Sequence, residues 1–103
     1  MYKSGDVILA LVQYADTFEV KQRPAVVLYV EHGNIVIAGI TSNTAMDGIP
    51  LTKEEGAVKE SVIKVNYIFT IAGQMAIKKL FSLSPEKKRQ VYFELEKRIA
   101  ALN

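Results

Sequence analysis

Arg23 and Thr41 are the side chains of this 103-residue chain whose types and spacing best suit chemistry on a phosphate. An arginine guanidinium holds phosphate oxygens through two parallel hydrogen bonds and stays charged at physiological pH. A threonine hydroxyl can donate one further hydrogen bond to the same group, and Ser42 offers a second hydroxyl beside it. Such groups bind a phosphate and stabilise negative charge that develops on it during a reaction.

A strand pair must carry these residues to one end of a sheet. The residue before a proline favours extended backbone, and a proline can open a strand without breaking its ladder. Arg23 therefore precedes a predicted strand, Pro24–Glu31, and the chain returns along a second strand, Ile35–Ser42. The two strands form a hairpin whose open end holds both candidate groups.

The register of this hairpin depends on its loop. With a three-residue loop, His32–Asn34, Ala25 faces Thr41, and Arg23 becomes the diagonal neighbour of Thr41 on one face. The alternative is a two-residue loop, Gly33-Asn34. It would place Thr41 on the face opposite to that of Arg23. We favour the longer loop because it leaves Ala25 and Gly39, both small, beside the two candidate groups. The longer loop also pairs apolar residues across the two strands and so forms an apolar face that can join the core. The pairs are Val26 with Ile40, Leu28 with Ala38, and Val30 with Val36.

Composition bounds the class of protein. The length predicts one domain spanning residues 1–103. Half of the residues are hydrophobic, which is enough to form a core that is stable without disulfide bonds. There are no cysteines, which favours a reducing compartment and a cytoplasmic location. The apolar runs are shorter than the roughly 18 residues that cross a bilayer, so no membrane association is expected. A net charge of +2 is too small to indicate a class of binding partner.

The remaining pattern predicts a mainly β fold with a C-terminal helix. Ser84 is a good N-cap, Pro85 suits the first helical position, and Glu86 places negative charge in the first turn. Five or six short strands before one helix suggest a small, strongly bent antiparallel barrel. The other expected segments are strands at Val7–Tyr14, Ile49–Thr52, Ser61–Val65 and Tyr67–Ile71, and a short helix at Gln74–Phe81.

Several of these segments resemble the MazF/PemK/Kid family of toxin ribonucleases. The family signature begins with Gly-Asp and a hydrophobic strand, as in Gly5–Leu9, and continues with Arg-Pro and a second hydrophobic strand, as in Arg23–Val27. Ile40–Ser42 resembles the second conserved block, and Ser61–Val65 with Ile68–Ile71 resembles the third. The resemblance covers nearly the whole chain. One departure is Lys64, which stands where the family usually has an arginine.

The resemblance implies a homodimeric SH3-like barrel that cleaves single-stranded RNA without a metal or another cofactor. In such enzymes the 2′-hydroxyl attacks the adjacent phosphate, and the two key positions map onto Arg23 and Thr41. It also implies the toxin of a type II toxin–antitoxin pair, whose partner is a cognate antitoxin protein. A disordered antitoxin tail would fold as it covers the RNA groove.

Further substrate contacts are expected from neighbours of these two residues. Ser42 supplies a hydroxyl, Lys21 and Gln22 adjoin Arg23 and suit contacts to the RNA backbone, and Lys64 can add charge from a neighbouring strand. Phe18 lies in the polar loop Ala15–Gln22. Its ring either stacks on a base or anchors this loop onto the barrel.

No general base stands out. His32 is expected in the hairpin turn at the far end of the strands from Arg23, and the remaining acids near Arg23 are Asp16 and Glu19. No His, Asp or Glu cluster has metal-ligand spacing. The alternative function is a non-catalytic module on the same fold, either a gyrase poison like the related CcdB toxins or an inactive homologue that binds RNA or protein.

Overall fold

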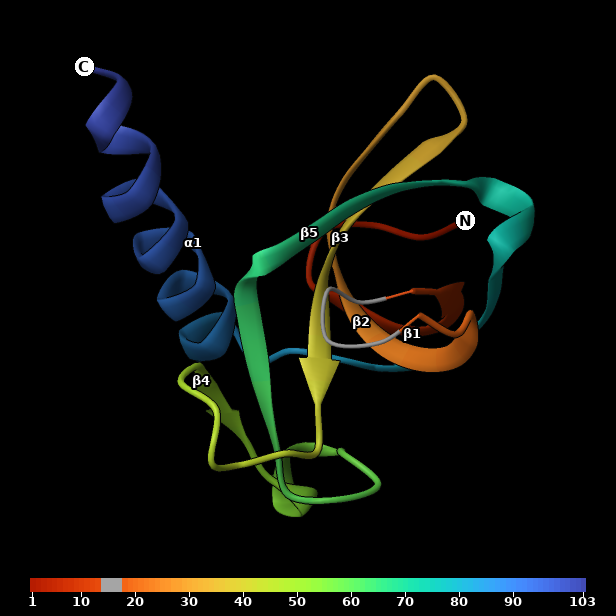
Figure 1. Cartoon of the computed structure of the whole chain (residues 1–103), viewed down its shortest axis with the longest axis horizontal. Coiled ribbons are helices and arrows are strands. Elements are labelled where there is room, and N and C mark those ends of the chain that lie inside the picture. Colours follow the sequence, from red (N-terminus) through yellow and green to blue (C-terminus); the bar gives the residue numbers. More distant parts are fainter. Residues whose placement is uncertain (14–17) are drawn as a thin grey trace.

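The computed structural model describes residues 1–13 and 18–103, in which six strands precede one α-helix (Figure 1). The predicted mainly β fold with a C-terminal helix is confirmed. The strands are β1 Asp6–Val12, β2 Lys21–Glu31, β3 Asn34–Thr41, β4 Ile49–Leu51, β5 Ser61–Ala72 and β6 Ala76–Ser82. The helices are α1 Pro85–Ile99 and the 3-10 turns η1 Lys53–Glu55, η2 Gly73–Met75 and η3 Ala100–Leu102.

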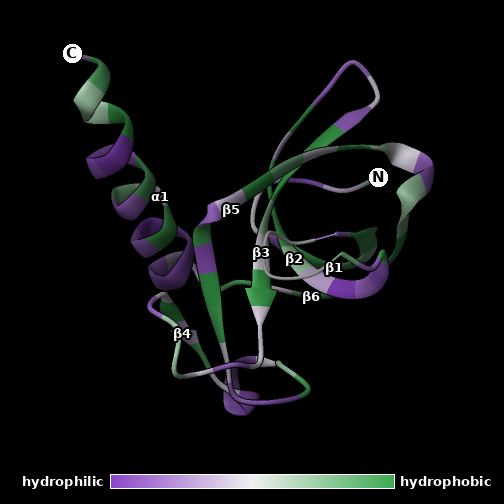
Figure 2. Ribbon diagram, viewed as in Figure 1, coloured by the Kyte–Doolittle hydropathy of each residue, from purple (hydrophilic) through white to green (hydrophobic). Residues whose placement is uncertain are grey.

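The strands form one antiparallel sheet in the order β4-β5-β3-β2-β1-β6, and this sheet curls into a half-barrel (Figure 1). Apolar side chains on both of its faces are buried. Val7 and Val26 belong to a cluster that also contains Val91 of α1, whereas their neighbours Ile8 and Ala25 belong to a second cluster. The strands are accordingly green along much of their length in Figure 2, while α1 alternates between purple and green.

The β2–β3 hairpin differs from both predicted registers. Its loop is His32-Gly33, and Glu31 pairs with Asn34. Both loop residues have positive φ, 52° for His32 and 79° for Gly33, as a type I′ turn requires. This turn matches the right-handed twist of the flanking strands, which explains why it is adopted although a histidine must take the left-handed conformation.

A bulge further along the hairpin compensates for the shorter loop. The register shifts between Val27 and Tyr29, after which Ala25 pairs with Gly39 rather than with Thr41. Continuing this pairing by two residues sets Arg23 opposite Thr41. The predicted partners were wrong, but the face was not, because the bulge restores the alternation that the shorter loop had changed.

The segment predicted as a short helix at Gln74–Phe81 is mostly a strand. Only Gly73–Met75 forms a 3-10 turn, and β6 then pairs with β1 as an edge strand. Short apolar runs fit either periodicity, and here the open edge of β1 decides the structure. The two segments predicted at Ser61–Val65 and Tyr67–Ile71 are one continuous strand, β5.

Helix α1 begins where the sequence indicates. The Ser84 hydroxyl accepts a hydrogen bond from Lys87 N at 3.1 Å, and Pro85 occupies the first turn. Lys87 also anchors this end of the helix, because its Nζ lies 3.3 Å from Glu55 Oε2 and donates to the Pro50 carbonyl oxygen at 2.6 Å. The C-terminal half of α1 rises away from the half-barrel (Figure 1).

Candidate functional site

Arg23 lies near the start of β2, in the central part of the sheet. Its backbone pairs with Ala10 of β1, and Pro24 beside it pairs with Leu9. The Arg23 side chain is half-buried and its Nε atom is buried. The flanking strand therefore fixes the backbone of Arg23 and limits the conformational freedom of its side chain.

Thr41 closes β3 and is 8% exposed. Its Oγ1 accepts a hydrogen bond from Asn43 N at 3.1 Å, and Asn43 Oδ1 accepts one from Ala45 N at 3.2 Å. These two local bonds define the turn after β3. Because Thr41 Oγ1 uses an acceptor site in this turn, its own proton can still be donated to a ligand.

Arg23 and Thr41 line the same cavity, a cleft of about 680 Å³. Lys21, Gln22 and Ser42, which the sequence also predicted, line it as well. We call this cavity the basic cleft and define it by six of its lining residues, Lys21, Arg23, Thr41, Ser42, Lys59 and Lys78. The structure thus brings five of the seven predicted site residues together.

The cleft is positively charged. Its described lining holds one arginine and three lysines but no aspartate or glutamate. Lys21 Nζ is 3.5 Å from the Glu19 carboxylate, in a pair whose side chains are both more than half exposed. Exposed pairs of this kind are weak and are screened by salt, so Lys21 remains able to exchange its partner for a ligand phosphate.

Lys64 and Phe18 do not line the basic cleft. Lys64 is 8% exposed, its Nζ donates to the Asp47 carbonyl oxygen at 2.5 Å, and the same atom lies 5.4 Å from the centre of the Tyr67 ring. Phe18 is 98% exposed and therefore does not anchor its loop on the barrel. Its ring is accessible to solvent, whereas Lys64 holds the turn that contains Asp47.

His32 occupies the hairpin turn, as predicted. Its ring is exposed, and its Nε2 lies 3.7 Å from the Glu31 carboxylate. Among the described residues that line the basic cleft there is neither a histidine nor a carboxylate. Asp16, considered as a base from the sequence, lies outside the described residues.

Sequence reasoning missed two cations of the cleft, Lys59 and Lys78. Lys78 belongs to β6, where the expected helix would have placed it differently. Lys59 precedes β5, and its carbonyl oxygen accepts a hydrogen bond from Ser61 Oγ at 2.8 Å. Once β6 is known to be a strand, the position of Lys78 follows, because Lys79 turns to Asp6, at 3.3 Å, and Lys78 must then face the other way.

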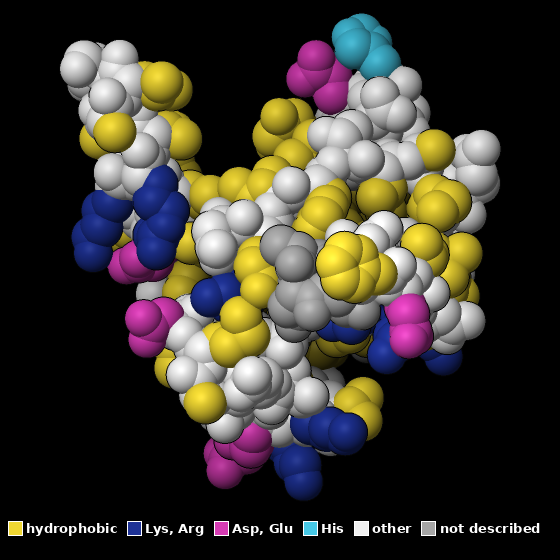
Figure 3. Space-filling view, in the orientation of Figure 1, with side chains coloured by type: hydrophobic (Ala, Val, Ile, Leu, Met, Phe, Trp, Pro, Cys, Tyr) yellow, Lys and Arg dark blue, Asp and Glu magenta, His cyan; other side chains and the backbone are white. Residues whose placement is uncertain are grey.

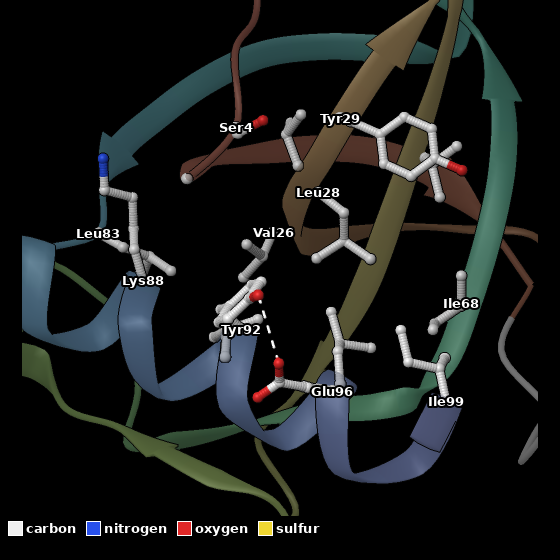
Figure 4. Close-up of a pocket in the computed structure, with 15 residues that line it drawn as sticks. Ser4, Val26, Leu28, Tyr29, Ile68, Leu83, Lys88, Tyr92, Glu96 and Ile99 are labelled. Carbon is white, nitrogen blue, oxygen red and sulfur yellow. Dashed lines mark hydrogen bonds between the residues drawn. The ribbon is translucent and has the colours of Figure 1, made fainter. Parts of the chain in front are cut away.

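A second cavity, of about 720 Å³, lies between α1 and the sheet (Figure 4). We call it the helix groove. Its exposed apolar lining includes Tyr29 and Ile68 from the strands and Tyr92 and Ile99 from α1. Figure 3 shows hydrophobic side chains along the hollow between α1 and the half-barrel. Tyr92 Oη and Glu96 Oε2 are 3.4 Å apart at its edge.

The model of the "PemK-like, MazF-like toxin of type II toxin-antitoxin system" family matches residues 3–99. The chain belongs to this family. The match spans β1 through α1, and so includes the strands that carry Arg23 and Thr41 of this MazF-like protein. No curated protein sequence matches the chain.

Solved structures share the MazF-like fold at low sequence identity. The Mycobacterium tuberculosis toxin MazF-mt6 has a TM-score of 0.73 at 20% identity, covering 89% of this chain and 93% of that one. A MazE-MazF structure from Deinococcus radiodurans has a TM-score of 0.76 at 15% identity, covering 96% of each. An endoribonuclease in complex with its cognate antitoxin, from a mycobacterial species, has a TM-score of 0.73 at 10% identity, covering 96% and 93%.

None of the helices in residues 1–13 and 18–103 is long and apolar enough to cross a membrane. Within the same ranges, no group of three or more His, Asp or Glu side chains is arranged to hold a metal ion.

Proposed function

We propose that this protein is a metal-independent endoribonuclease that cleaves single-stranded RNA, and that it acts as the toxin of a type II toxin–antitoxin pair. The observation that carries the proposal is the joint presence of Arg23 and Thr41 in one basic cleft. Family membership supports the same activity, because MazF-like toxins are generally endoribonucleases.

In the proposed reaction the ribose 2′-oxygen attacks the adjacent phosphorus, and the bond from phosphorus to the 5′-oxygen breaks. The products are a 2′,3′-cyclic phosphate and a 5′-hydroxyl, whose oxygen gains a proton as the 2′-oxygen loses one. Arg23 would hold the phosphate oxygens and offset their growing charge, and Thr41 would donate one hydrogen bond to them. Ser42, Lys21 and Gln22 would hold the flanking RNA.

An assay on long single-stranded RNA in the presence of EDTA tests this proposal. We expect discrete fragments that carry cyclic phosphates and 5′-hydroxyls, because the attacking group belongs to the substrate. Replacing the ribose at a mapped cleavage site with 2′-deoxyribose should block cleavage there and leave other sites unaffected. Fragments that form only with magnesium would contradict the mechanism, and RNA binding without cleavage would favour the non-catalytic module.

An antitoxin is the expected protein partner. Two of the structurally similar proteins are described as complexes with an antitoxin, one as MazE-MazF and one as an endoribonuclease with its cognate antitoxin. We propose that an acidic antitoxin segment covers the basic cleft of this chain, since the cleft is lined by cations. Such a segment should inhibit RNA cleavage in proportion to its occupancy of the cleft.

We propose that the protein acts as a homodimer that buries the helix groove. Exposed apolar side chains from two parts of the fold line this groove, and large exposed apolar patches mark interaction sites. Light scattering should show a dimer. Replacing Ile68 and Ile99 by glutamate should produce a monomer, whereas Val58→Glu, at a position 81% exposed outside the groove, should leave the dimer intact. A wild-type monomer would contradict this assignment.

A further inference from the structure

Lys64 is a buried cation that the proposed reaction does not use directly. It is 8% exposed and does not line the basic cleft. Its Nζ donates a hydrogen bond to the Asp47 carbonyl oxygen at 2.5 Å and lies 5.4 Å from the centre of the Tyr67 ring. Within the part of the chain that the structure describes, this ammonium has no carboxylate partner. Burying a charge is costly unless it is paired, so the contacts of Lys64 need an explanation.

The sheet places Lys64 on the face that Arg23 and Thr41 share. Gly39 of β3 pairs with Lys64 on one side and with Ala25 on the other. Thr41 follows Gly39 by two residues and Arg23 precedes Ala25 by two, so alternation along the strands turns all three long side chains to one face. The same pairing makes Lys64 the diagonal neighbour of Thr41, about 7–8 Å away.

The ammonium of Lys64 contacts the segment that follows Thr41. We call residues 42–48, which join β3 to β4, the β3–β4 turn. At the start of this turn Asn43 N donates a hydrogen bond to Thr41 Oγ1 at 3.1 Å. Near its end, the Asp47 carbonyl oxygen accepts the hydrogen bond from Lys64. Lys64 therefore holds one end of the turn whose other end holds the Thr41 hydroxyl.

Most of the β3–β4 turn is exposed, and a few contacts attach it to the sheet. Met46 is partly buried and packs against the cluster that contains Ile8 and Ala25. Gly48 approaches β5 so closely that an added Cβ would lie 2.7 Å from the Ile63 carbonyl oxygen. The other five residues of the turn are exposed. The hydrogen bond from Lys64 thus adds an anchor to a segment that has little buried surface of its own.

A role in the stability of the core does not explain Lys64 well. Replacing a buried cation with an apolar side chain of similar volume is often neutral or stabilising, because the cost of removing the charge from water disappears. The Asp47 carbonyl oxygen belongs to an exposed residue and can accept a hydrogen bond from water instead. The contacts of Lys64 are therefore better explained by the placement of the turn.

We propose that Lys64 is a positioning residue, which holds the β3–β4 turn so that Asn43 fixes the Thr41 side chain with its hydroxyl proton directed at the reacting phosphate. This inference rests on the proposed function and adds a residue to the same site. Lys64 touches neither the substrate nor the reacting atoms. It acts through Asp47, Asn43 and Thr41 in turn.

Lys64→Met tests the inference through the mobility of the turn and the rate of cleavage. The amide hydrogen of Asn43 should exchange about tenfold faster than in the wild type, the factor expected when one hydrogen bond to a charged group is lost. Single-turnover cleavage should fall about tenfold, less than the 10²-fold that a misplacement of about 1 Å can cost. The loss should fall on kcat rather than on KM, because the cations of the basic cleft are unchanged.

A double-mutant cycle shows whether Lys64 acts through Thr41. If it does, Lys64→Met should have little further effect on the cleavage rate once Thr41→Val has removed the hydroxyl, so the two losses should not add. Additive losses would mean that the two side chains act independently, and the inference would be wrong.

Binding of a probe that cannot be cleaved separates positioning from direct contact. The probe is a fully 2′-O-methylated RNA oligonucleotide, whose affinity is measured between about 50 and 200 mM salt. A contact between Lys64 and a phosphate would contribute about 0.7 to the slope of log affinity against log salt. We expect Lys64→Met to keep the wild-type slope, and a slope lower by about 0.7 would overturn the inference.

Two control variants accompany these measurements. Lys64→Arg keeps a cationic donor at this position and should restore most of the wild-type rate. Lys87→Met removes another lysine that donates to a backbone carbonyl, that of Pro50 in β4, which lies beyond the turn. Because β4 is also held by its pairing with β5, this variant should leave both the exchange of Asn43 and the cleavage rate unchanged.

The outcomes separate this inference from the proposed function. If the wild type cleaves RNA and Lys64→Met matches its rate and its amide exchange, the positioning role is wrong while the proposed function stands. If the wild type does not cleave RNA, the proposed function is wrong, and exchange at Asn43 decides alone. Faster exchange in Lys64→Met would then still support its hold on the turn, and unchanged exchange would overturn it.

Discussion

Replacement of Arg23 by alanine should lower the rate of RNA cleavage by about 10²–10³-fold, the loss found when one preorganised donor to a developing charge is removed. The effect should fall on kcat more than on KM, because Arg23 is proposed to stabilise charge that grows in the transition state and other cations still attract the RNA. Single-turnover cleavage of an RNA with one mapped site, measured in EDTA, checks this. An alanine variant that cleaves at the wild-type rate would falsify the assignment of Arg23.

Matched variants separate charge from geometry. Arg23→Lys keeps the positive charge but loses the two parallel hydrogen bonds, so its rate should lie between those of the wild type and the alanine variant. Thr41→Val keeps the side-chain shape but removes both the donated hydrogen bond and the acceptor for Asn43 N. Thr41→Ser retains both and should stay close to the wild type. Thermal unfolding shows whether any variant loses activity through instability.

The pairing of Arg23 and Thr41 illustrates what the sequence could and could not predict. Strand positions followed from Arg23-Pro24 and from the apolar runs, and the shared face followed from alternation. The register did not follow, because it depends on a type I′ turn with His32 at positive φ and on a bulge near Leu28. This bulge has no sequence signal of its own. The shorter loop and the bulge each shift the register by one residue, so their effects on which side chains share a face cancel.

Segment β6 shows a second limit. The alternation of apolar and polar residues in its sequence is weak. In the structure this segment is an edge strand whose pairing with β1 shifts register twice. Tertiary pairing decides such a short segment, and its intrinsic periodicity does not. The missed strand explains the missed cleft residue Lys78, since only a strand turns Lys78 and Lys79 to opposite sides.

The helix N-terminus, by contrast, was predictable because its signals are local. Ser84 caps α1 through Lys87 N, and Pro85 needs no hydrogen-bond acceptor in the first turn. The cleft is a non-local feature. Lys59 reaches it because antiparallel pairing places the start of β5 next to the end of β3, which no short window of sequence encodes.

Removal of the Asp6 carboxylate should destabilise the fold while leaving the cleft residues in place. Asp6 is 2% exposed, and its carboxylate accepts hydrogen bonds from Lys3 N at 3.0 Å and Ser82 Oγ at 3.2 Å. Lys79 Nζ lies 3.3 Å away and is half-exposed. Asp6→Ala should lower the free energy of unfolding by about 2–3 kcal/mol, below the range for fully buried pairs because Lys79 stays partly solvated. Urea denaturation at neutral pH measures this loss.

The same carboxylate makes stability depend on pH in a predictable direction. Burial alone would raise the pKa of Asp6, but the hydrogen bonds from Lys3, Lys79 and Ser82 and the charge of Lys79 outweigh it, and the pKa is lowered. Its stabilisation is therefore fully present above the pKa of the unfolded chain and is lost as the pH falls through the lower pKa of the folded state.

Asp6→Asn isolates this contribution from those of other acids. Glu55 also has a lowered pKa, since the hydrogen bonds from Thr52 and Lys87 outweigh its desolvation, so the wild type should lose stability in acid for more than one reason. The difference in unfolding free energy between wild type and Asp6→Asn should be largest near neutral pH and shrink in acid, because the wild-type carboxyl is then protonated as well. A difference that stays constant from neutral to acid pH would show that Asp6 acts through its shape and hydrogen bonds, with no contribution from its charge.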